Sequence, residues 1–262
     1  MIKFNKAALA VLALGASSVA SAAMYEAPPG MMQESAPSNH GVYLGIGAGG
    51  IGFESQVTHS GSTTIVDQGF SDSVDGGNYG LNGYLLAGYA WTFPNKVFLA
   101  GEIFGTLTNA PVTINTTQTW PGVGGATNSD NANVGIKLDG TYGVRLLPGY
   151  QVTPSSVVYG IIGYSRADTS TSSTLSINAD GEVANQSTSD SFWFNGLQLG
   201  LGSMISVTDH IALRGDLIWT GYQSQTIAGG STTTASGNVI QDTVTAQPTT
   251  IEADVGLIYM FD

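Results

Sequence analysis

The sequence contains no cysteine, which excludes disulfide bonds, a cysteine-ligated metal site and the lipidated cysteine of a lipoprotein. It has only 7 lysines and arginines against 19 aspartates and glutamates, and its formal net charge is -12. A nucleic-acid-binding protein needs a basic face, and this composition provides none. No apolar run reaches the roughly 18 residues that a transmembrane helix requires. A soluble sheet and a membrane β-barrel share such a composition, so the pattern along the chain must distinguish them.

The first 22 residues are typical of a secretory signal peptide. Lys3 and Lys6 give a positive start, residues 7–16 are apolar, and residues 17–22 are small and end in Ala-x-Ala. The apolar segment is too short to span a bilayer, which makes an N-terminal anchor helix the less favoured alternative. We expect cleavage after Ala22, with Ala23 as the alternative. Residues 23–40, interrupted by proline and glycine, predict a flexible periplasmic linker, and residues 41–262 predict one β-barrel domain.

Period-two alternation of apolar and polar residues dominates the rest of the chain. In the last segment Leu257 and Tyr259 share an apolar face, and Asp254 lies on the opposite face. Such alternation predicts strands with one apolar and one polar side. Eight segments show it, the first and fifth less clearly than the others: 41–53, 81–91, 97–107, 134–146, 157–166, 197–205, 211–219 and 252–261.

Three features favour a barrel in a membrane over a soluble sandwich. The apolar faces stay free of charge over about eight to ten residues, which is the length of a tilted membrane-spanning strand. Aromatic residues lie at the strand ends on these faces, as in the aromatic girdle of outer-membrane barrels. The expected girdle residues are Tyr89, Trp91, Trp219, Tyr259 and Phe261. The third feature is the alternating length of the connections between strands.

Short connections at 92–95, 152–155 and 208–209 alternate with long ones at 57–77, 109–132, 169–191 and 225–249. The sequence therefore predicts an all-β fold, an eight-stranded antiparallel up-and-down transmembrane β-barrel with four long external loops and short periplasmic turns. The long loops contain acidic residues and no lysine or arginine. They are either solvated, mobile loops or surfaces that bind a host ligand or divalent cations near lipopolysaccharide. Their acidic residues lack the spacing of a calcium-binding loop.

Charged residues on the polar faces predict a salt-bridged network inside the barrel, because a buried charge needs a partner. The heights of the residues on neighbouring strands predict the pairs Glu102 with Arg145, and Arg214 with Asp254 or Glu252. Strand tilt shifts these heights, so the partners could exchange. The interior of an eight-stranded barrel is just wide enough to be filled by side chains. The network is therefore either a structural plug or the lining of a narrow, gated pore. The full predicted set is Glu102, Lys137, Asp139, Arg145, Arg214, Asp216, Glu252 and Asp254.

The segments 142–154 (YGVRLLPGYQVTP) and 158–166 (VYGIIGYSR) resemble paired strands of the opacity-type and OmpA-like outer-membrane β-barrel proteins. The segments 200–202 (GLG), 211–216 (IALRGD) and 255–261 (VGLIYMF) are similar too. The resemblance implies a mostly monomeric barrel in the outer membrane of a Gram-negative bacterium, in contact with its lipid and lipopolysaccharide. It also implies insertion by the outer-membrane assembly machinery through a C-terminal aromatic residue, although here Asp262 follows Phe261.

Three functions remain open from the sequence. The first is a structural or surface-interaction protein, such as a surface antigen or an adhesin-like protein, and the second is a small diffusion porin. The third is a lipid A-modifying enzyme, which would need histidine, serine and carboxylate side chains at the outer edge of the barrel. His40 lies in the linker, His59 in the first long connection and His210 at a short turn, and none has a recognisable constellation around it. We therefore expect no enzymatic activity, no cofactor and no metal site.

Overall fold

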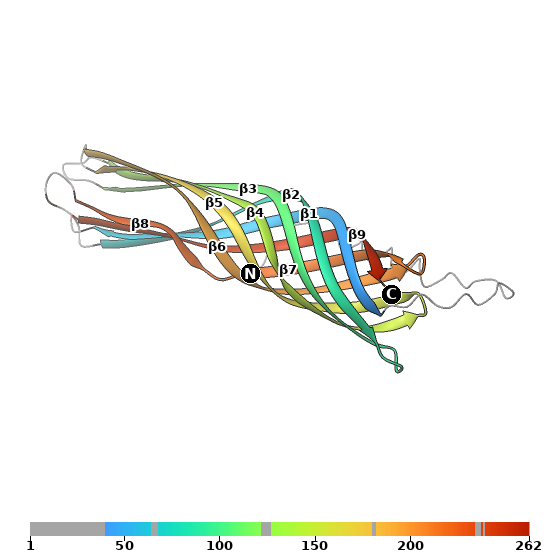
Figure 1. Cartoon of the computed structure of the whole chain (residues 1–262). Helices are drawn as coiled ribbons and strands as arrows, with labels where there is room; N and C mark the ends of the chain where they lie inside the picture. Colours follow the sequence, from blue (N-terminus) through green and yellow to red (C-terminus); the bar gives the residue numbers. More distant parts are fainter. Residues whose placement is uncertain are drawn as a thin grey trace.

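The computed structural model describes residues 40–63, 68–121, 127–179, 182–233, 237 and 239–261. They form nine antiparallel strands, β1 (Gly41–Thr63), β2 (Gln68–Thr92), β3 (Val97–Pro121), β4 (Thr127–Thr153), β5 (Ser156–Ala179), β6 (Glu182–Ser206), β7 (Ile211–Tyr222), β8 (Gln225–Thr233) and β9 (Val239–Phe261). The sheet order is β1-β2-β3-β4-β5-β6-β7-β9-β8, and β1 also pairs with β9, which closes a barrel (Figure 1). The expected signal peptide and all but the last residue of the expected linker lie outside the described residues.

The nine strands occupy eight positions around the barrel, because β7 and β8 both pair with β9, one after the other along its length. Residues Ile211–Gly221 of β7 pair with Tyr259–Thr249 of β9, and residues Gln225–Thr233 of β8 pair with Ala246–Val239. The predicted eight-stranded, up-and-down antiparallel barrel is thus confirmed. Its seventh strand is broken into two segments at residues 223–224.

The three short connections lie at one end of the barrel, which we call the turn end. β2 and β3 are joined by residues 93–96, β4 and β5 by 154–155, and β6 and β7 by 207–210. In the first turn the Phe93 amide donates to the Val97 carbonyl at 2.8 Å, and the Lys96 amide donates to Phe93 at 2.9 Å. Lys96 has a φ of 66°, in the left-handed region that such a tight reversal requires. The opposite end, where the long connections lie, is the hairpin end.

The long connections differ from the predicted loops, because most of their residues continue as paired strands. The β1–β2 ladder runs out to Thr63 and Gln68, and the β5–β6 ladder runs out to Ala179 and Glu182. β-Branched residues, threonine above all, are frequent in these segments and fit a pleated sheet. A ladder also satisfies the backbone N–H and C=O groups that an irregular loop would leave to water. The hairpins therefore continue the barrel as long paired strands toward the hairpin end (Figure 1).

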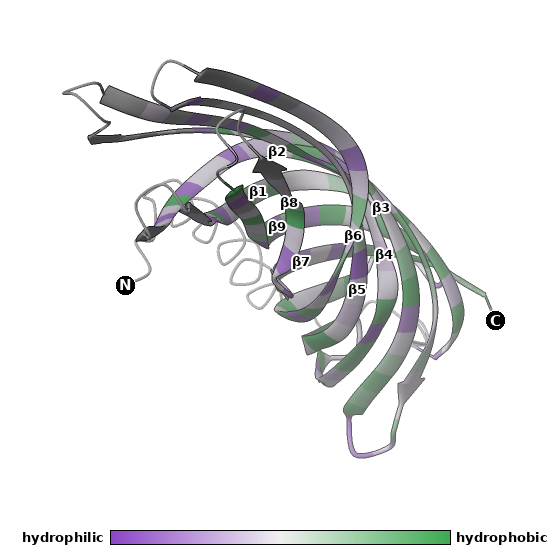
Figure 2. Ribbon diagram, turned by 90° about the vertical axis from the view of Figure 1, so that its left-hand side faces the viewer, coloured by the Kyte–Doolittle hydropathy of each residue, from purple (hydrophilic) through white to green (hydrophobic). Residues whose placement is uncertain are grey.

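The predicted orientation of the strand faces is confirmed at the residues that distinguish a lipid-facing wall from a soluble one. Leu213 and Leu257 point outward, each 51% exposed, whereas Arg214 and Asp254 point inward, 4% and 6% exposed. Hydrophobic residues gather on the strands toward the end where the C-terminus lies (Figure 2). Trp219 pairs with Ile251, ten residues before Phe261. At about 3.3 Å per residue and a tilt of roughly 40°, this span is about 25 Å high, which matches the apolar band of outer-membrane barrels.

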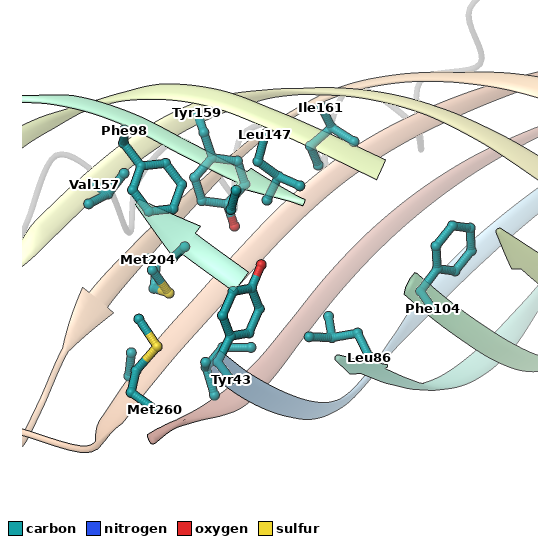
Figure 3. Packing of buried hydrophobic residues seen from close by; sticks show 14 of the residues in the cluster. Tyr43, Leu86, Phe98, Phe104, Leu147, Val157, Tyr159, Ile161, Met204 and Met260 are labelled. Atoms are coloured by element: carbon teal, nitrogen blue, oxygen red, sulfur yellow. The ribbon is translucent and has the colours of Figure 1, made fainter. Parts of the chain in front are cut away.

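The interior is packed in three layers. An apolar cluster at the turn end includes Phe98, Tyr159, Met204 and Met260 (Figure 3). Next lies a layer of charged and polar side chains around Arg214, which we call the lumenal charge layer. A second apolar cluster fills the space between the hairpin extensions, with members on eight of the nine strands. Its residues are Ile51, Phe53, Val57, Ala110, Val112, Ile114, Val134, Ile136, Leu138, Ala167, Phe194, Tyr222, Ile227, Val244 and Ala246.

Candidate functional site

The expected girdle residues all lie on the outer wall, but they belong to two rings. At the turn end Tyr89 contacts Trp91 with ring centroids 4.8 Å apart, and Tyr259 contacts Phe261 at 4.9 Å. Trp219 lies near the other edge of the apolar band. Sequence analysis missed two members of that second ring, Tyr142 and Trp193, whose rings contact one another at 6.1 Å. Tyr142 lies within the alternating segment 134–146 and Trp193 lies four residues before the segment 197–205, so neither stands at a segment end, where a girdle residue is expected.

Arg214 on β7 forms the centre of the lumenal charge layer. Its guanidinium pairs with the Glu102 carboxylate through two nitrogens, one of them at 3.1 Å, and its Nε donates to Asp216 at 2.7 Å. The Tyr43 hydroxyl donates to Glu102 at 2.6 Å, and the Tyr159 hydroxyl donates to Asp216 at 2.8 Å. Figure 3 shows these two hydroxyl groups turned toward one another. Each carboxylate therefore receives both a guanidinium and a phenol, which compensates for its loss of hydration.

The predicted ion pairs were wrong in their partners. Glu102 and Arg145 do lie opposite one another in the β3–β4 ladder, yet Glu102 pairs across the lumen with Arg214. Arg145 instead donates from Nε to Gln198 at 2.9 Å and lies over the Phe104 ring at 3.7 Å. Long side chains in a narrow barrel reach the far wall, so partners are not limited to the adjacent strand. Neighbour rules for sheets describe only the near contacts.

Asp254 or Glu252 of β9 was predicted to bind Arg214, but both accept hydrogen bonds from Asn82 of β2. Glu252 also accepts one from the Thr250 hydroxyl at 3.4 Å. The Asn82 amide nitrogen donates to Asp254 at 2.9 Å and to Glu252 at 3.4 Å. An amide can satisfy two carboxylates because its nitrogen carries two hydrogens. Sequence analysis missed both Asn82 and Gln198, since neutral amides do not stand out in a chain rich in asparagine and glutamine.

Lys137 and Asp139 do not belong to the lumen, which corrects the prediction. They form a 2.8 Å ion pair on the outer surface of β4, and their side chains are 49% and 32% exposed. The β4–β5 register shifts between Leu138 and Gly140, so one extra residue reverses the faces of β4 at this point. Partial burial of Asp139 disfavours its ionisation, but hydrogen bonds from Lys137 and Ser170 outweigh that effect and lower the pKa of the carboxyl.

The remaining members of the predicted network meet in one closed layer. Glu102, Arg145, Arg214, Asp216, Glu252 and Asp254 are each no more than 7% exposed. The apolar clusters described above cover this layer on both sides. Among the described residues, the interior of the barrel is therefore filled by side chains at three successive heights.

The histidines are spread along the barrel. His40 contacts Tyr89 and Trp91 at the turn end, and His210 stacks on Tyr259 at 5.9 Å. His59 is buried on β1 in the hairpin extension, where the sequence predicted an external loop. In the described part of the chain no three histidine, aspartate or glutamate side chains are grouped to hold a metal ion.

The hairpin extension consists of two four-stranded sheets, because strand pairing stops at two seams. β2 pairs with β3 only from Asn82 to Thr92, so its outer part has no ladder to β3. This first seam is nevertheless closed by packing. Side chains at Gly76 and Gly80 would collide with Ile114 and with the backbone of Asn109, and Asn78 donates to the Pro111 carbonyl at 2.9 Å.

The second seam lies between β6 and β8, and it is open. β6 pairs with β7 from Gly196 to Ser206, and the Gln223 amide donates to Asn195 at 2.8 Å where β7 ends. Beyond that point no described residue of β8 pairs with β6. A cleft of about 560 Å³ fills the gap, and its walls include Thr188, Asp190, Thr226, Ile227, Ser231 and Gln241.

Three solved outer-membrane proteins illustrate what this chain is similar to. No protein-family model matches the sequence, and no curated protein matches it. The crystal structure of the outer membrane protease OmpT from Escherichia coli aligns with 86% of this chain and 98% of its own, at 10% identity and a TM-score of 0.45. The outer membrane protein OprG from Pseudomonas aeruginosa aligns with 87% of this chain and 99% of its own, at 13% identity and 0.37. The attachment invasion locus protein Ail of Yersinia pestis aligns with 86% of this chain and 100% of its own, at 12% identity and 0.34. Similarities this weak establish neither a family nor a function; the strand registers define the architecture.

Proposed function

We propose that this chain is an integral barrel of the Gram-negative outer membrane that presents its hairpin extension at the cell surface as a structural and surface-interaction protein. The observation that carries the proposal is a filled interior inside an apolar outer wall. In lipid only helices and closed barrels satisfy all their backbone hydrogen bonds, and this sheet closes through β1 and β9. The turn end then faces the periplasm and the hairpin end faces outward.

The filled interior favours a surface role over the alternative of a small diffusion porin. A pore would need a continuous polar path, and here the lumenal charge layer lies between two apolar clusters. Opening it would separate Arg214 from both Glu102 and Asp216. Breaking a buried ion pair costs about 3–5 kcal/mol, so spontaneous opening would be rare.

The test uses the mature chain refolded into lipid. A difference in gel migration between the unheated and the heated sample shows that the chain is folded. In a planar bilayer we expect no unitary conductance steps from the folded protein. Lipid A from cells that express it should keep its mass, since the third candidate, a lipid A-modifying enzyme, would shift it. Reproducible steps from folded protein would replace this proposal with the porin alternative, and altered lipid A would replace it with the enzyme.

A further inference from the structure

We propose that the open seam between β6 and β8 binds an extended, cationic peptide segment of another protein by strand addition. The inference deepens the proposed surface role and rests on it. It is carried by the juxtaposition of two unpaired strand edges, the cleft between them and the acidic character of the surface around them.

The two edges facing the cleft are free to pair along most of their length. β8 has nine residues and pairs on one side only, with β9. β6 pairs with β5 along its whole length, but its other edge has no ladder from Glu182 to Asn195. Unpaired edge groups form a ready template for another strand. A peptide lying between the edges would hydrogen bond on both sides and complete the sheet.

Neither edge contains proline or lysine, although β6 carries the acidic residues Glu182 and Asp190 and the β8–β9 register shifts between Thr226 and Ala228. Proline or lysine usually blocks an exposed edge from pairing. Residues 182–194 and 225–233 contain neither. The first seam offers a comparison within the same molecule, since Pro111 lies on its β3 edge and Asn78 bridges it. The chain thus closes one seam and leaves the other available.

The side chains of the cleft show what kind of peptide would fit. Asp190 lies on the same face of β6 as the buried Phe194, yet it is exposed because no strand covers it. Ile227 is buried behind the cleft. Ile227 and Asp190 both lie on the inner face of the extension, so the inward-facing side chains of an added strand would include apolar ones beside Ile227 and cationic ones beside Asp190. A cleft of about 560 Å³ falls within the usual range of roughly 300–1,000 Å³ for ligand sites.

Charge on the rest of the extension favours a cationic partner. The four long connections contain no lysine or arginine, Asp75 and Asp190 are exposed within them, and Glu54 is exposed just before the first of them. Opposite charge speeds encounter and selects among partners. Strand addition supplies affinity through main-chain hydrogen bonds, while alternate side chains supply specificity.

The experiment uses the full mature chain, folded in lipid nanodiscs, and a fluorescent nine-residue peptide in which the alternate positions that form one face of the strand carry both valine and lysine. We expect saturable binding by anisotropy, and slower amide hydrogen exchange in residues 182–194 and 225–233 but not in β3. The same peptide with every second amide N-methylated should lose binding, since it can no longer donate to one of the two edges. A peptide with glutamate in place of lysine should also fail.

Asp190→Lys should weaken binding roughly three- to tenfold, as expected for reversing one exposed charge contact. The matched control is Asp75→Lys, which changes the same charge on β2, outside the cleft. Undiminished binding of the N-methylated peptide, equal effects of the two variants, or no binding to folded protein would each overturn the inference. So would self-association that protects the same strands without peptide. None of these results would make the barrel conduct, so the proposed function is tested separately by the bilayer measurement.

Discussion

Replacing Arg214 by methionine should be the most damaging single change in the lumenal charge layer. Methionine preserves much of the apolar stem but removes the guanidinium that binds Glu102 and Asp216. Both carboxylates would remain buried, held only by the Tyr43 and Tyr159 hydroxyls. Removing one partner of a buried ion pair costs about 3–5 kcal/mol, and we expect this loss in the free energy of unfolding.

The measurement is urea unfolding of the refolded barrel in lipid vesicles, followed by tryptophan fluorescence. At an m-value of about 1–3 kcal/mol per molar, the midpoint should fall by at least about 1 M. Lys137→Met is the matched control, because it removes the cation of an exposed ion pair and should cost no more than about 1 kcal/mol. In the double variant Glu102→Gln/Arg214→Met the two losses should be less than additive. Equal losses for Arg214→Met and Lys137→Met would refute the account of the layer.

Three further changes test separate parts of the structure. Leu257→Arg puts a charge on the outer wall and should destabilise the barrel by about 2–4 kcal/mol in lipid, as measured by urea unfolding; a neutral effect would contradict the lipid-facing assignment. Tyr43→Phe removes the 2.6 Å hydrogen bond to Glu102 and should lower the unfolding free energy by about 1–3 kcal/mol, with circular dichroism confirming an unchanged fold. The lowered pKa of Asp139 should stabilise the fold above the ordinary carboxyl range and lose that effect as pH falls through the lowered value. NMR titration should show the pKa returning toward normal in Lys137→Met, and an unchanged pKa would contradict the assignment.

The wall of the barrel could be predicted from the sequence because the direction in which each side chain points depends on residues adjacent in the chain. Each strand alternates with a period of two, so the apolar face of Leu213 and Leu257 follows from adjacent residues. The alternation of short and long connections also fixed which strand ends lie together. The break between β7 and β8 left no clear signal, since residues 223–224 resemble the polar residues that follow them.

The interior and the hairpin extension depended on information that the sequence does not display locally. One extra residue near Asp139 reverses the face of β4, so Val134 and Ile136 point inward although they share the parity of the outward-facing Val144. The partner of Arg214 is set by the width of the lumen, which depends on all strands together. Val112 and Ile114 carry a signal of the extension, because their alternation continues into a segment whose threonine and asparagine content predicts a loop.

The central claim is that lipid, and not water, surrounds the outer wall. The absence of native cysteine makes this directly measurable, since a single introduced cysteine can be labelled at any position. Nitroxide labels on Leu257→Cys and Ile258→Cys in lipid vesicles should differ in their accessibility to oxygen. The label at residue 257 should collide with oxygen dissolved in the bilayer. The label at residue 258, which is buried in the native barrel, should be protected from oxygen and from a water-soluble nickel chelate. Equal accessibility at both positions, or a label on residue 257 that the nickel chelate reaches freely, would contradict a membrane-embedded barrel.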